Sequence, residues 1–530
     1  MAKRNLLKIM ALGLMVASAL APSSGTVAQS AQQTTAFTIS PVVKRGDPRM
    51  DGGTFFDFDF CDVRIAGEHG LNDLGQVVIS GFVGNCTTGV YVVSDRTGFP
   101  VADTCHPTPF GRLALYAGAN INNRGHVALN MGPAVNNTIV DMILLYSDGR
   151  LSKIVADGDQ SPRGPIFGDC GFSAPIINNK SEVAFSGCSK EGALGRNGIF
   201  VYADGILRQV LQGGDSSPLG GVLSLNLFPS QPVFINDGGD ILFRAGQLDP
   251  DITVPERFGL FLATAEGIKR VELSKDPMPN GSTAADNSIG RGTLNNNGAV
   301  AFGLRLSGKP KAGGFVWSGG QTSTIILDRG PAPTGGTFDL RSEVEDIGGP
   351  RINNNGTIAF MANVIGGSSP EAIFLASPKA IVKVVGIGDR LPTGEKIRSI
   401  NSFSLNNLGQ VAFFANGSAS ILNPNPLGVY LATPVAPSIS SIKLKHKPAG
   451  LQVRVNGSAM IPGDTVIEIN GVPVGAIDYP ADSKQDGGFT TQVISRDPQL
   501  EQLMAEGQTV QVTVFNSLTN LRSAPFSLTR

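Results

Sequence analysis

Four aspartates recur beside a glycine and shortly before a proline, and carboxylates of this kind are ligands that hard cations prefer. They are Asp47, Asp159, Asp215 and Asp389. A set of carboxylates binds a cation only where its oxygens converge on one point. Their regular place beside glycine instead indicates turns at strand ends, in which the side chain bonds its own backbone. We therefore expect a structural role for these residues.

The histidines and the other acidic residues give no pattern of a catalytic or metal centre. His69, His106, His126 and His446 stand at no spacing typical of metal ligands,. We expect His126, on a strand, to be a surface or packing residue. Paired carboxylates for glycoside hydrolysis would have to converge on one point, and nucleophile, phosphate-loop and dinucleotide motifs lack a supporting context. We predict no catalytic residue, no cofactor and no metal.

Four of the five cysteines form two pairs, and each pair lies about symmetrically around an expected hairpin turn. The pairs are Cys61 with Cys86 and Cys170 with Cys188. Residues equidistant from a hairpin turn face each other across antiparallel strands, within reach of a disulfide. We therefore predict a disulfide in each pair, which requires an oxidising compartment.

The fifth cysteine, Cys105, is left over by this pairing. It either competes for Cys86 or is a buried free thiol, and the free thiol is our expectation. The sequence has no C-x-x-C, so a zinc site is not expected.

The elements that position these residues are organised around a nine-residue stretch that occurs seven times, with starts 50 to 59 residues apart,. The first Asn of each copy is Asn72, Asn122, Asn178, Asn236, Asn295, Asn353 and Asn406. Asn bonds its own backbone in tight turns, and the Gly three residues later takes positive φ at no steric cost. The flanking apolar residues alternate as in strands, so each copy predicts a hairpin turn.

Each copy is followed by a second strand, a variable loop, a third strand and a fourth strand that ends near a Gly-Asp pair. Four antiparallel strands repeated radially make up the blades of a β-propeller. We predict an all-β protein with a seven-bladed propeller over residues 37–433. The seventh unit stops after its third strand, and Phe37 to Pro48 carries the fourth-strand pattern. The N-terminal strand is therefore expected to close the ring and leave no open edge.

These units resemble an exported bacterial tandem-repeat family of unknown function with an NxxGxxxAF signature. The residues that carry the resemblance are Asn295, Gly298, Ala301 and Phe302, and Asn353, Gly356, Ala359 and Phe360. Here two residues, one fewer than in the signature, separate Gly from Ala. Ser181 replaces Gly in the third copy and Leu129 replaces Phe in the second, which predicts altered turns or cores there. The resemblance implies repeats and export, and brings no catalytic residues.

The composition changes after Pro434, and residues 438–530 alternate apolar and polar residues at strand spacing without the Asn turn,. This segment resembles the immunoglobulin-like IPT/TIG modules. The resemblance is carried by Leu451, Val453, Gly457, Gly463, Val466, the NGVPV from Asn470, Val512, Val514 and Asn516. It implies a small β-sandwich, joined by a short stiff linker that contains Pro434 and Pro437.

The N-terminal residues have the pattern of a secretory signal peptide. Lys3, Arg4 and Lys8 precede the apolar run from Ile9 to Ala21,. We predict cleavage after residue 28, with Ala19 or Ala21 as earlier sites and an uncleaved anchor as the alternative. Because 42 Lys and Arg balance 43 Asp and Glu, nucleic-acid binding is not expected. The chain is therefore expected to be a secreted monomer, extracellular or periplasmic, that does not insert into a membrane.

Function is predicted from this architecture alone. The loops between second and third strands vary in length, and variable loops on a rigid scaffold commonly carry recognition. We predict a non-enzymatic binding or scaffold protein whose ligand, an unknown protein or a glycan, binds the face opposite the Asn turns. The alternative is an exported polysaccharide hydrolase or lyase, which three or more titratable side chains converging at the channel mouth would favour.

Overall fold

The computed structural model describes residues 36–56, 63–67, 69–81, 89–135, 138–190, 196–225, 233–248, 257–340, 349–419 and 425–530. Strands dominate these residues, which confirms an all-β protein; helix is limited to α1 (Leu500–Leu503) and a short 3-10 turn, η2 (Ala481–Ser483). Within the described ranges no helix is both long and apolar enough to cross a membrane. The expected signal peptide, residues 1–28, lies outside them, as do Cys61 and Cys86.

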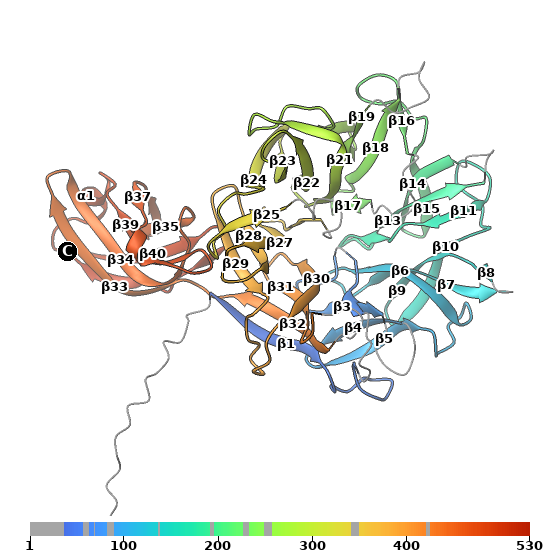
Figure 1. The fold of residues 1–530 in the computed structure, drawn as a ribbon, viewed down its shortest axis with the longest axis horizontal. Coiled ribbons are helices and arrows are strands. Elements are labelled where there is room, and N and C mark those ends of the chain that lie inside the picture. Colours follow the sequence, from blue (N-terminus) through green and yellow to red (C-terminus); the bar gives the residue numbers. More distant parts are fainter. Residues whose placement is uncertain are drawn as a thin grey trace, which may run out of the picture. The chain divides into compact units, whose positions relative to one another are not determined.

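Seven antiparallel sheets of one design follow one another around a common centre (Figure 1). Sheet 1 contains β2 (Val63–Ile65), β3 (Val77–Gly81), β4 (Gly89–Ser94) and β5 (Thr97–Asp103). Sheet 2 contains β6 (Leu113–Ile121), β7 (Val127–Val135), β8 (Thr138–Ile139), β9 (Met142–Ser147) and β10 (Arg150–Ala156). Sheet 3 contains β11 (Phe167–Phe172), β12 (Ile176–Ile177), β13 (Val183–Ser189), β14 (Arg196–Ala203) and β15 (Ile206–Gln212).

The next four sheets repeat this order. Sheet 4 contains β16 (Val222–Ser224), β17 (Phe234–Ile235), β18 (Ile241–Leu248), β19 (Arg257–Thr264) and β20 (Gly267–Leu273). Sheet 5 contains β21 (Thr283–Leu294), β22 (Val300–Ser307), β23 (Ala312–Ser318) and β24 (Gln321–Leu327). Sheet 6 contains β25 (Thr337–Asp339), β26 (Arg351–Ile352), β27 (Ile358–Ile365), β28 (Glu371–Ala376) and β29 (Ile381–Gly386). Sheet 7 contains β30 (Ser399–Leu405), β31 (Val411–Asn416), β32 (Pro426–Pro434) and β1 (Phe37–Lys44).

Sheet 7 joins the two ends of the repeat region. Strand β1 pairs antiparallel with β32, from Phe37 opposite Pro434 to Lys44 opposite Gly428. Val43 and Phe37 are buried in this pairing. The expectation that the N-terminal strand supplies the missing fourth strand is confirmed, and β32 gains a partner along its outer edge.

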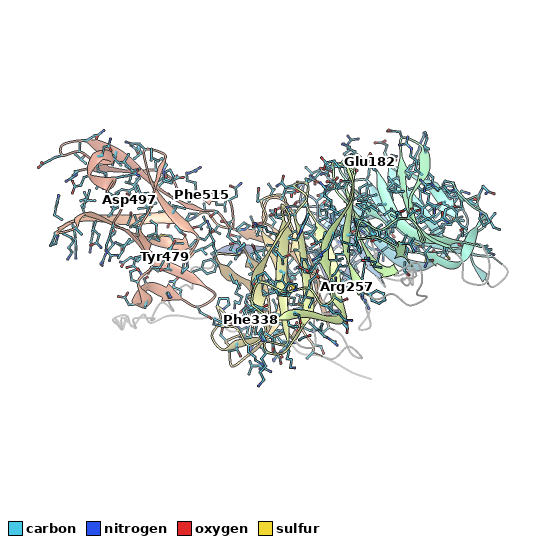
Figure 2. The ribbon with its side chains drawn as sticks, turned by 90° about the horizontal axis from the view of Figure 1, so that it is seen from above. Glu182, Arg257, Phe338, Tyr479, Asp497 and Phe515 are labelled. Carbon is cyan, nitrogen blue, oxygen red and sulfur yellow. The ribbon has the colours of Figure 1, made fainter. Side chains whose placement is uncertain are left out.

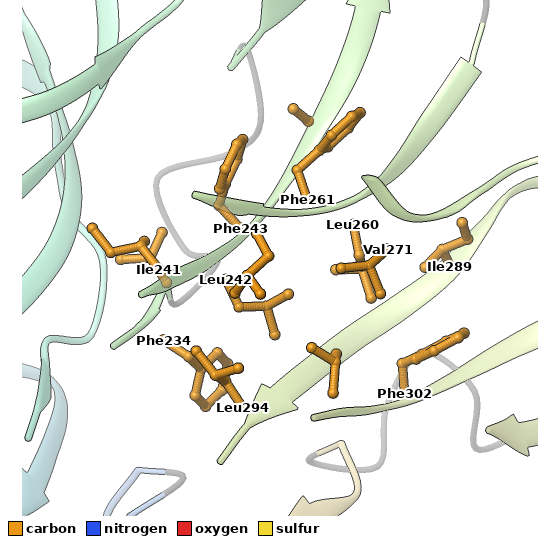
Figure 3. Close-up of a cluster of buried hydrophobic side chains, with 14 of the residues drawn as sticks. Phe234, Ile241, Leu242, Phe243, Leu260, Phe261, Val271, Ile289, Leu294 and Phe302 are labelled. Atoms are coloured by element: carbon orange, nitrogen blue, oxygen red, sulfur yellow. The ribbon is translucent and has the colours of Figure 1, made fainter. Parts of the chain in front are cut away.

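The phenylalanine that ends most copies of the repeat packs against an aromatic ring on the third strand of the same sheet. Phe243 stacks on Phe261 with ring centroids 5.7 Å apart, in the core shown in Figure 3. The same cross-strand pair occurs in sheets 3, 5, 6 and 7 as Phe185 with Phe200, Phe302 with Phe315, Phe360 with Phe374, and Phe413 with Tyr430. Directly opposed aromatic residues stabilise a sheet beyond their burial.

The two departures from the repeat have different outcomes. Leu129 lies opposite Leu144, and both are fully buried, so sheet 2 has an aliphatic pair at the position of the aromatic pairs in sheets 3 to 7. Ser181 adopts φ of 68°, the conformation of the glycines at the same position. The altered turn predicted for the third copy is therefore wrong. His126 Nδ1 and Ser181 Oγ are 2.8 Å apart, a hydrogen bond that holds this strained residue,.

Residues 438–530 form two further sheets. One contains β33 (Ser438–Lys447), β34 (Gly450–Met460), β37 (Ile477–Asp478), β38 (Lys484–Gln485) and β39 (Phe489–Ser495). The other contains β35 (Thr465–Ile469), β36 (Val472–Val474), β40 (Thr509–Asn516), β41 (Leu521–Arg522) and β42 (Phe526–Thr529). Val453, Ile467 and Val512 belong to one buried core that both sheets share. Tyr479, labelled in Figure 2, donates its hydroxyl to the Thr465 carbonyl at 2.7 Å and ties the sheets together.

Candidate binding site at the centre of the seven sheets

The first Asn of each turn is buried, and its carboxamide holds both its own turn and the neighbouring sheet. In sheet 6, Asn353 Oδ1 accepts the N–H of Asn355 at 3.1 Å and of Thr357 at 2.9 Å. Its Nδ2 donates to the main-chain carbonyl of Asn406 in sheet 7 at 3.2 Å. The side chain of the first Asn therefore forms hydrogen bonds within its own turn and one further hydrogen bond to the turn of the next sheet.

The bond to the next sheet is made in all seven sheets, always in the same direction. Donor Nδ2 to acceptor carbonyl, the pairs are Asn72 to Asn122 (3.0 Å), Asn122 to Asn178 (2.9 Å), Asn178 to Asn236 (2.9 Å), Asn236 to Asn295 (3.2 Å), Asn295 to Asn353 (2.9 Å), Asn353 to Asn406 (3.2 Å) and Asn406 to Asn72 (3.1 Å). We call this closed cycle the inner amide ring. Glu182, labelled in Figure 2, also accepts from Asn178 Nδ2 at 2.6 Å.

The second residue of each turn forms a parallel cycle, which we call the outer ring. Its members are Asp73, Asn123, Asn179, Asp237, Asn296, Asn354 and Asn407. Each main-chain N–H donates to the side-chain Oδ1 of the next member, at 2.7–2.9 Å. Two cycles of hydrogen bonds therefore hold the seven turns at fixed positions around the centre.

The outer ring is not symmetric, because two of its members are aspartates. Asp73 Oδ2 accepts the amides of both neighbours, Asn123 at 2.6 Å and Asn407 at 3.0 Å. Asp237 Oδ2 likewise accepts Asn179 at 3.0 Å and Asn296 at 2.6 Å. The seven outer-ring residues therefore form two groups, each made of one aspartate and its two neighbouring asparagines, and one residue is left over. The remainder is Asn354, whose Nδ2 has no hydrogen-bond partner among the residues that the structure describes.

A cavity of about 90 Å³ lies inside the two rings and is lined by all fourteen of their residues, together with His69, Thr293 and Arg351. Burial and, to a smaller extent, the charge of the nearby Arg351 lower the pKa of His69 to about 4, while Asp237 opposes the shift. The imidazole is therefore neutral at pH 7. The Arg351 guanidinium lies over the Phe403 ring at 5.2 Å. Of the 24 residues that line the cavity, twelve are asparagines and seven are the leucine or isoleucine that precedes the first Asn of each turn.

Four titratable side chains therefore line one cavity: His69, Asp73, Asp237 and Arg351. This convergence is the feature that would favour the enzymatic alternative. However, the aspartates accept hydrogen bonds from ring amides, and His69 packs against Phe234 with ring centroids 5.9 Å apart. These contacts hold Asp73, Asp237 and His69 in fixed positions as parts of the packed structure.

Residues 121–433 match a family of unknown function, DUF7453. The chain belongs to this family. Six of the seven Asn turns lie in the matched range, and the turn at Asn72 precedes it. The two rings are therefore built largely from the part of the chain that defines DUF7453.

No curated protein matches this DUF7453 chain. Similar solved structures include the β-propeller domain of the Trilobed protease from Pyrococcus furiosus, with TM-score 0.36, 11% identity, and coverage of 65% of this chain and 90% of that one. A fungal alcohol oxidase of the AA5 family, in complex with copper, has TM-score 0.36, 11% identity and coverage of 94% and 100%. Drosophila Semaphorin 1b, extracellular domains 1-2, has TM-score 0.29 and 10% identity, with coverage of 74% of this chain and 87% of that one. At these values nothing about activity or ligand follows for the DUF7453 chain.

The aspartates at the strand ends are turn residues, as expected. Each accepts the main-chain N–H three residues before it through Oδ2: Asp47 from Lys44 (2.9 Å), Asp159 from Ala156 (2.8 Å), Asp215 from Gln212 (2.8 Å) and Asp389 from Gly386 (2.9 Å). These bonds close the hairpin after the fourth strand.

The cysteines are described only in part. Cys188 and Cys105 are both disulfide-bonded, so the expectation of a free Cys105 thiol is wrong. Cys188 lies on β13, whose partner strand β11 contains Cys170. The pairing of Cys61 with Cys86 falls on residues outside the described ranges, and both predicted pairs stay predictions.

The predicted binding face also falls partly outside the described residues, since the loops at 136–137, 191–195, 249–256 and 420–424 are not described. The sequence predicts a ligand on that face and an architectural role for the Asn turns. In the structure, fourteen side chains of these turns surround one cavity, which the sequence did not predict. The signal was available, because polar residues in seven phased turns at the same end of seven radial sheets must meet.

Proposed function

We propose that this DUF7453 chain is an exported, monomeric, non-enzymatic binding protein. Its residues 37–433 form a seven-bladed β-propeller closed by the N-terminal strand, and residues 438–530 form an immunoglobulin-like domain. The order of strands in the seven sheets, the pairing of β1 with β32 and the shared core of the two C-terminal sheets support this architecture.

The central cavity is the proposed ligand site, and a glycan is the proposed partner. The observation that carries this proposal is the double ring, which holds fourteen carboxamide and carboxylate side chains around one opening. Such groups recognise hydroxyls, because they donate and accept hydrogen bonds at neutral pH. A volume of about 90 Å³ holds about three water molecules, so only a hydroxyl-bearing end of the ligand enters.

Asn354 is the proposed contact that orients this end. Every other outer-ring side chain either donates its amide to an aspartate or is that aspartate, whereas Asn354 Nδ2 has its donors available in the described structure. A hydroxyl or carbonyl oxygen of the ligand would accept from it. His69, being neutral at pH 7, adds no charge that would select for an anion.

A glycan array of the mature chain tests the proposal, followed by titration calorimetry with the strongest glycan. Asn354→Asp keeps the size and the Oδ1 acceptor and removes the donor, so we expect affinity to fall at least tenfold. Asn520→Asp, an exposed change in the turn between β40 and β41, is the matched control. Unchanged affinity in Asn354→Asp would refute the cavity as the ligand site, and the absence of binding on the array would refute a glycan as the ligand.

The variable loops on the opposite face are the other site that this experiment can reveal. Asn425→Ala changes one exposed residue of these loops. If it weakens binding while Asn354→Asp does not, the ligand site lies on that face, as the sequence predicts.

A polysaccharide hydrolase or lyase is the second candidate, favoured by the four titratable side chains in the cavity. It requires that the glycan bound in the calorimeter be cleaved. Release of new reducing ends, abolished by Asp237→Asn, would establish it. Intact glycan after prolonged incubation would exclude it for that substrate.

A further inference from the structure

A second group of side chains lies away from the central cavity, where the chain before sheet 1 meets the end of β5. Asp51, Asp103 and His106 each place one ligand atom within 4.8 Å of the others. Asp51 belongs to the hairpin after β1, and Asp103 is the last residue of β5. Residues about fifty positions apart are therefore brought together, outside the range that matches DUF7453.

Asp103 and His106 are held in one rigid turn. The Asp103 side chain is fully buried, and its Oδ1 accepts the N–H of Cys105 at 2.8 Å and of His106 at 2.7 Å. Its Oδ2 lies 2.8 Å from His106 Nδ1. Cys105, between them in the turn, is disulfide-bonded. A buried carboxylate that orients a histidine ring is the usual support of a metal-binding histidine.

Asp51 supplies the independent sign of a ligand. Its side chain is only 8% exposed. Oδ1 accepts from Arg49 Nε at 3.0 Å, whereas Oδ2 is buried and accepts no well-aligned hydrogen bond among the described residues, although the Tyr91 hydroxyl lies beside this carboxylate. A buried carboxylate oxygen without a partner is costly, and this one lies beside two other ligand atoms.

The charges at this point do not balance. Asp51 and Asp103 bring two negative charges, and Arg49 brings one positive charge, with its guanidinium also 5.8 Å from the Tyr91 ring. Among the described residues these three groups leave one net negative charge, so this point attracts a cation,.

We propose that Asp51, Asp103 and His106 form a zinc site. Two carboxylate oxygens and one imidazole nitrogen are a donor set that Zn²⁺ accepts, with the fourth position left to water. The His106 ring is 58% exposed, so the ion has a path from solvent. Ligand atoms around one zinc lie about 3.4 Å apart, so the widest separation, up to 4.8 Å, closes on binding. Because Nδ1 of His106 is bonded to Asp103 Oδ2 at 2.8 Å, the imidazole binds the ion through Nε2.

The test is titration calorimetry of the untagged mature chain with Zn²⁺, after treatment with a chelator and its removal. We expect one site per chain, and a rise in Tm with zinc concentration as binding to the folded state requires. His106→Gln removes the exposed ligand and is expected to lower the affinity at least tenfold. His446→Gln, another exposed histidine outside the site, is the matched control and is expected to change nothing.

Asp51→Asn is the second variant, because it tests the unpartnered oxygen without touching the turn at Asp103. It is also expected to weaken zinc binding at least tenfold. Absence of zinc binding in the native chain would overturn the proposal. Binding that survives both His106→Gln and Asp51→Asn would overturn it equally.

Discussion

Removing one carboxamide from the inner amide ring tests whether the ring stabilises the fold. Asn353→Ala deletes the bonds to the N–H of Asn355 and Thr357 and to the carbonyl of Asn406. Three hydrogen bonds at about 1 kcal/mol each amount to about 3 kcal/mol. The Thr357 N–H is left buried without a partner, whereas the Asn406 carbonyl keeps its turn bond from Gly409. The expected loss is therefore about 3 to 5 kcal/mol.

Differential scanning calorimetry of the mature chain measures this loss. At about 2 °C per kcal/mol for a large unit, Tm is expected to fall by about 6 to 10 °C. Asn425→Ala, an exposed change without these bonds, is the control. A fall of less than about 2 °C in Asn353→Ala would refute the stabilising role of the ring.

Asn353→Asp separates the ring from the turn. The introduced carboxylate can still accept both turn N–H groups, but it cannot donate to the Asn406 carbonyl and repels it. The variant is therefore expected to be less stable than native at pH 7. Because protonation restores a donor, the introduced carboxyl should have a raised pKa, and the deficit should shrink as pH falls. A deficit that is equal at pH 7 and pH 4 would show that the ring bond contributes nothing.

Three further outcomes are expected. Deleting β1, Phe37 to Lys44, should lower Tm by more than about 5 °C because the edge of β32 opens, and an unchanged Tm would contradict closure. Burial, aided by Asp276, raises the pKa of Glu272 to about 7. The folded state therefore binds more protons than the unfolded state between pH 4.5 and 7, and its stability falls as pH rises through this window,. The Tm of Glu272→Gln relative to that of the native chain should rise over the same window, and a constant difference in Tm would refute the pKa shift. Non-reducing peptide mapping should find Cys105 in a disulfide and decide whether Cys86 pairs with it or with Cys61; a free Cys105 thiol would contradict the structure.

Much of the fold was predictable because it depends on local chemistry. The Asx turns, the strand alternation and the fourth-strand pattern before Pro48 are properties of short segments, and they led to the pairing of β1 with β32. The outcome at Ser181 was not predictable. Its residue type argues against positive φ, and the compensating bond comes from His126 in the neighbouring sheet.

The candidate sites were harder to predict because they depend on contacts between distant segments. The side-chain amide of Asn354 lacks an acceptor because Asp73 and Asp237 each accept the amides of two other neighbours. Predicting this requires the order of the turns around the centre and the direction of each amide. The contact of Asp51 with Asp103 and His106 joins two hairpins. Neither hairpin carries a metal-ligand spacing of its own.

The closed cycles also constrain how the chain reaches its folded state. Asn406 donates to Asn72 across a sequence separation of 334 residues. Strand β1 likewise cannot pair until β32, near the end of the repeat region, has formed. Contacts this distant form slowly. Until they form, six sheets can be complete while one strand edge stays open to any extended segment. We expect that closure is the last step, and that a second copy's β1 inserted at this edge would give a domain-swapped dimer.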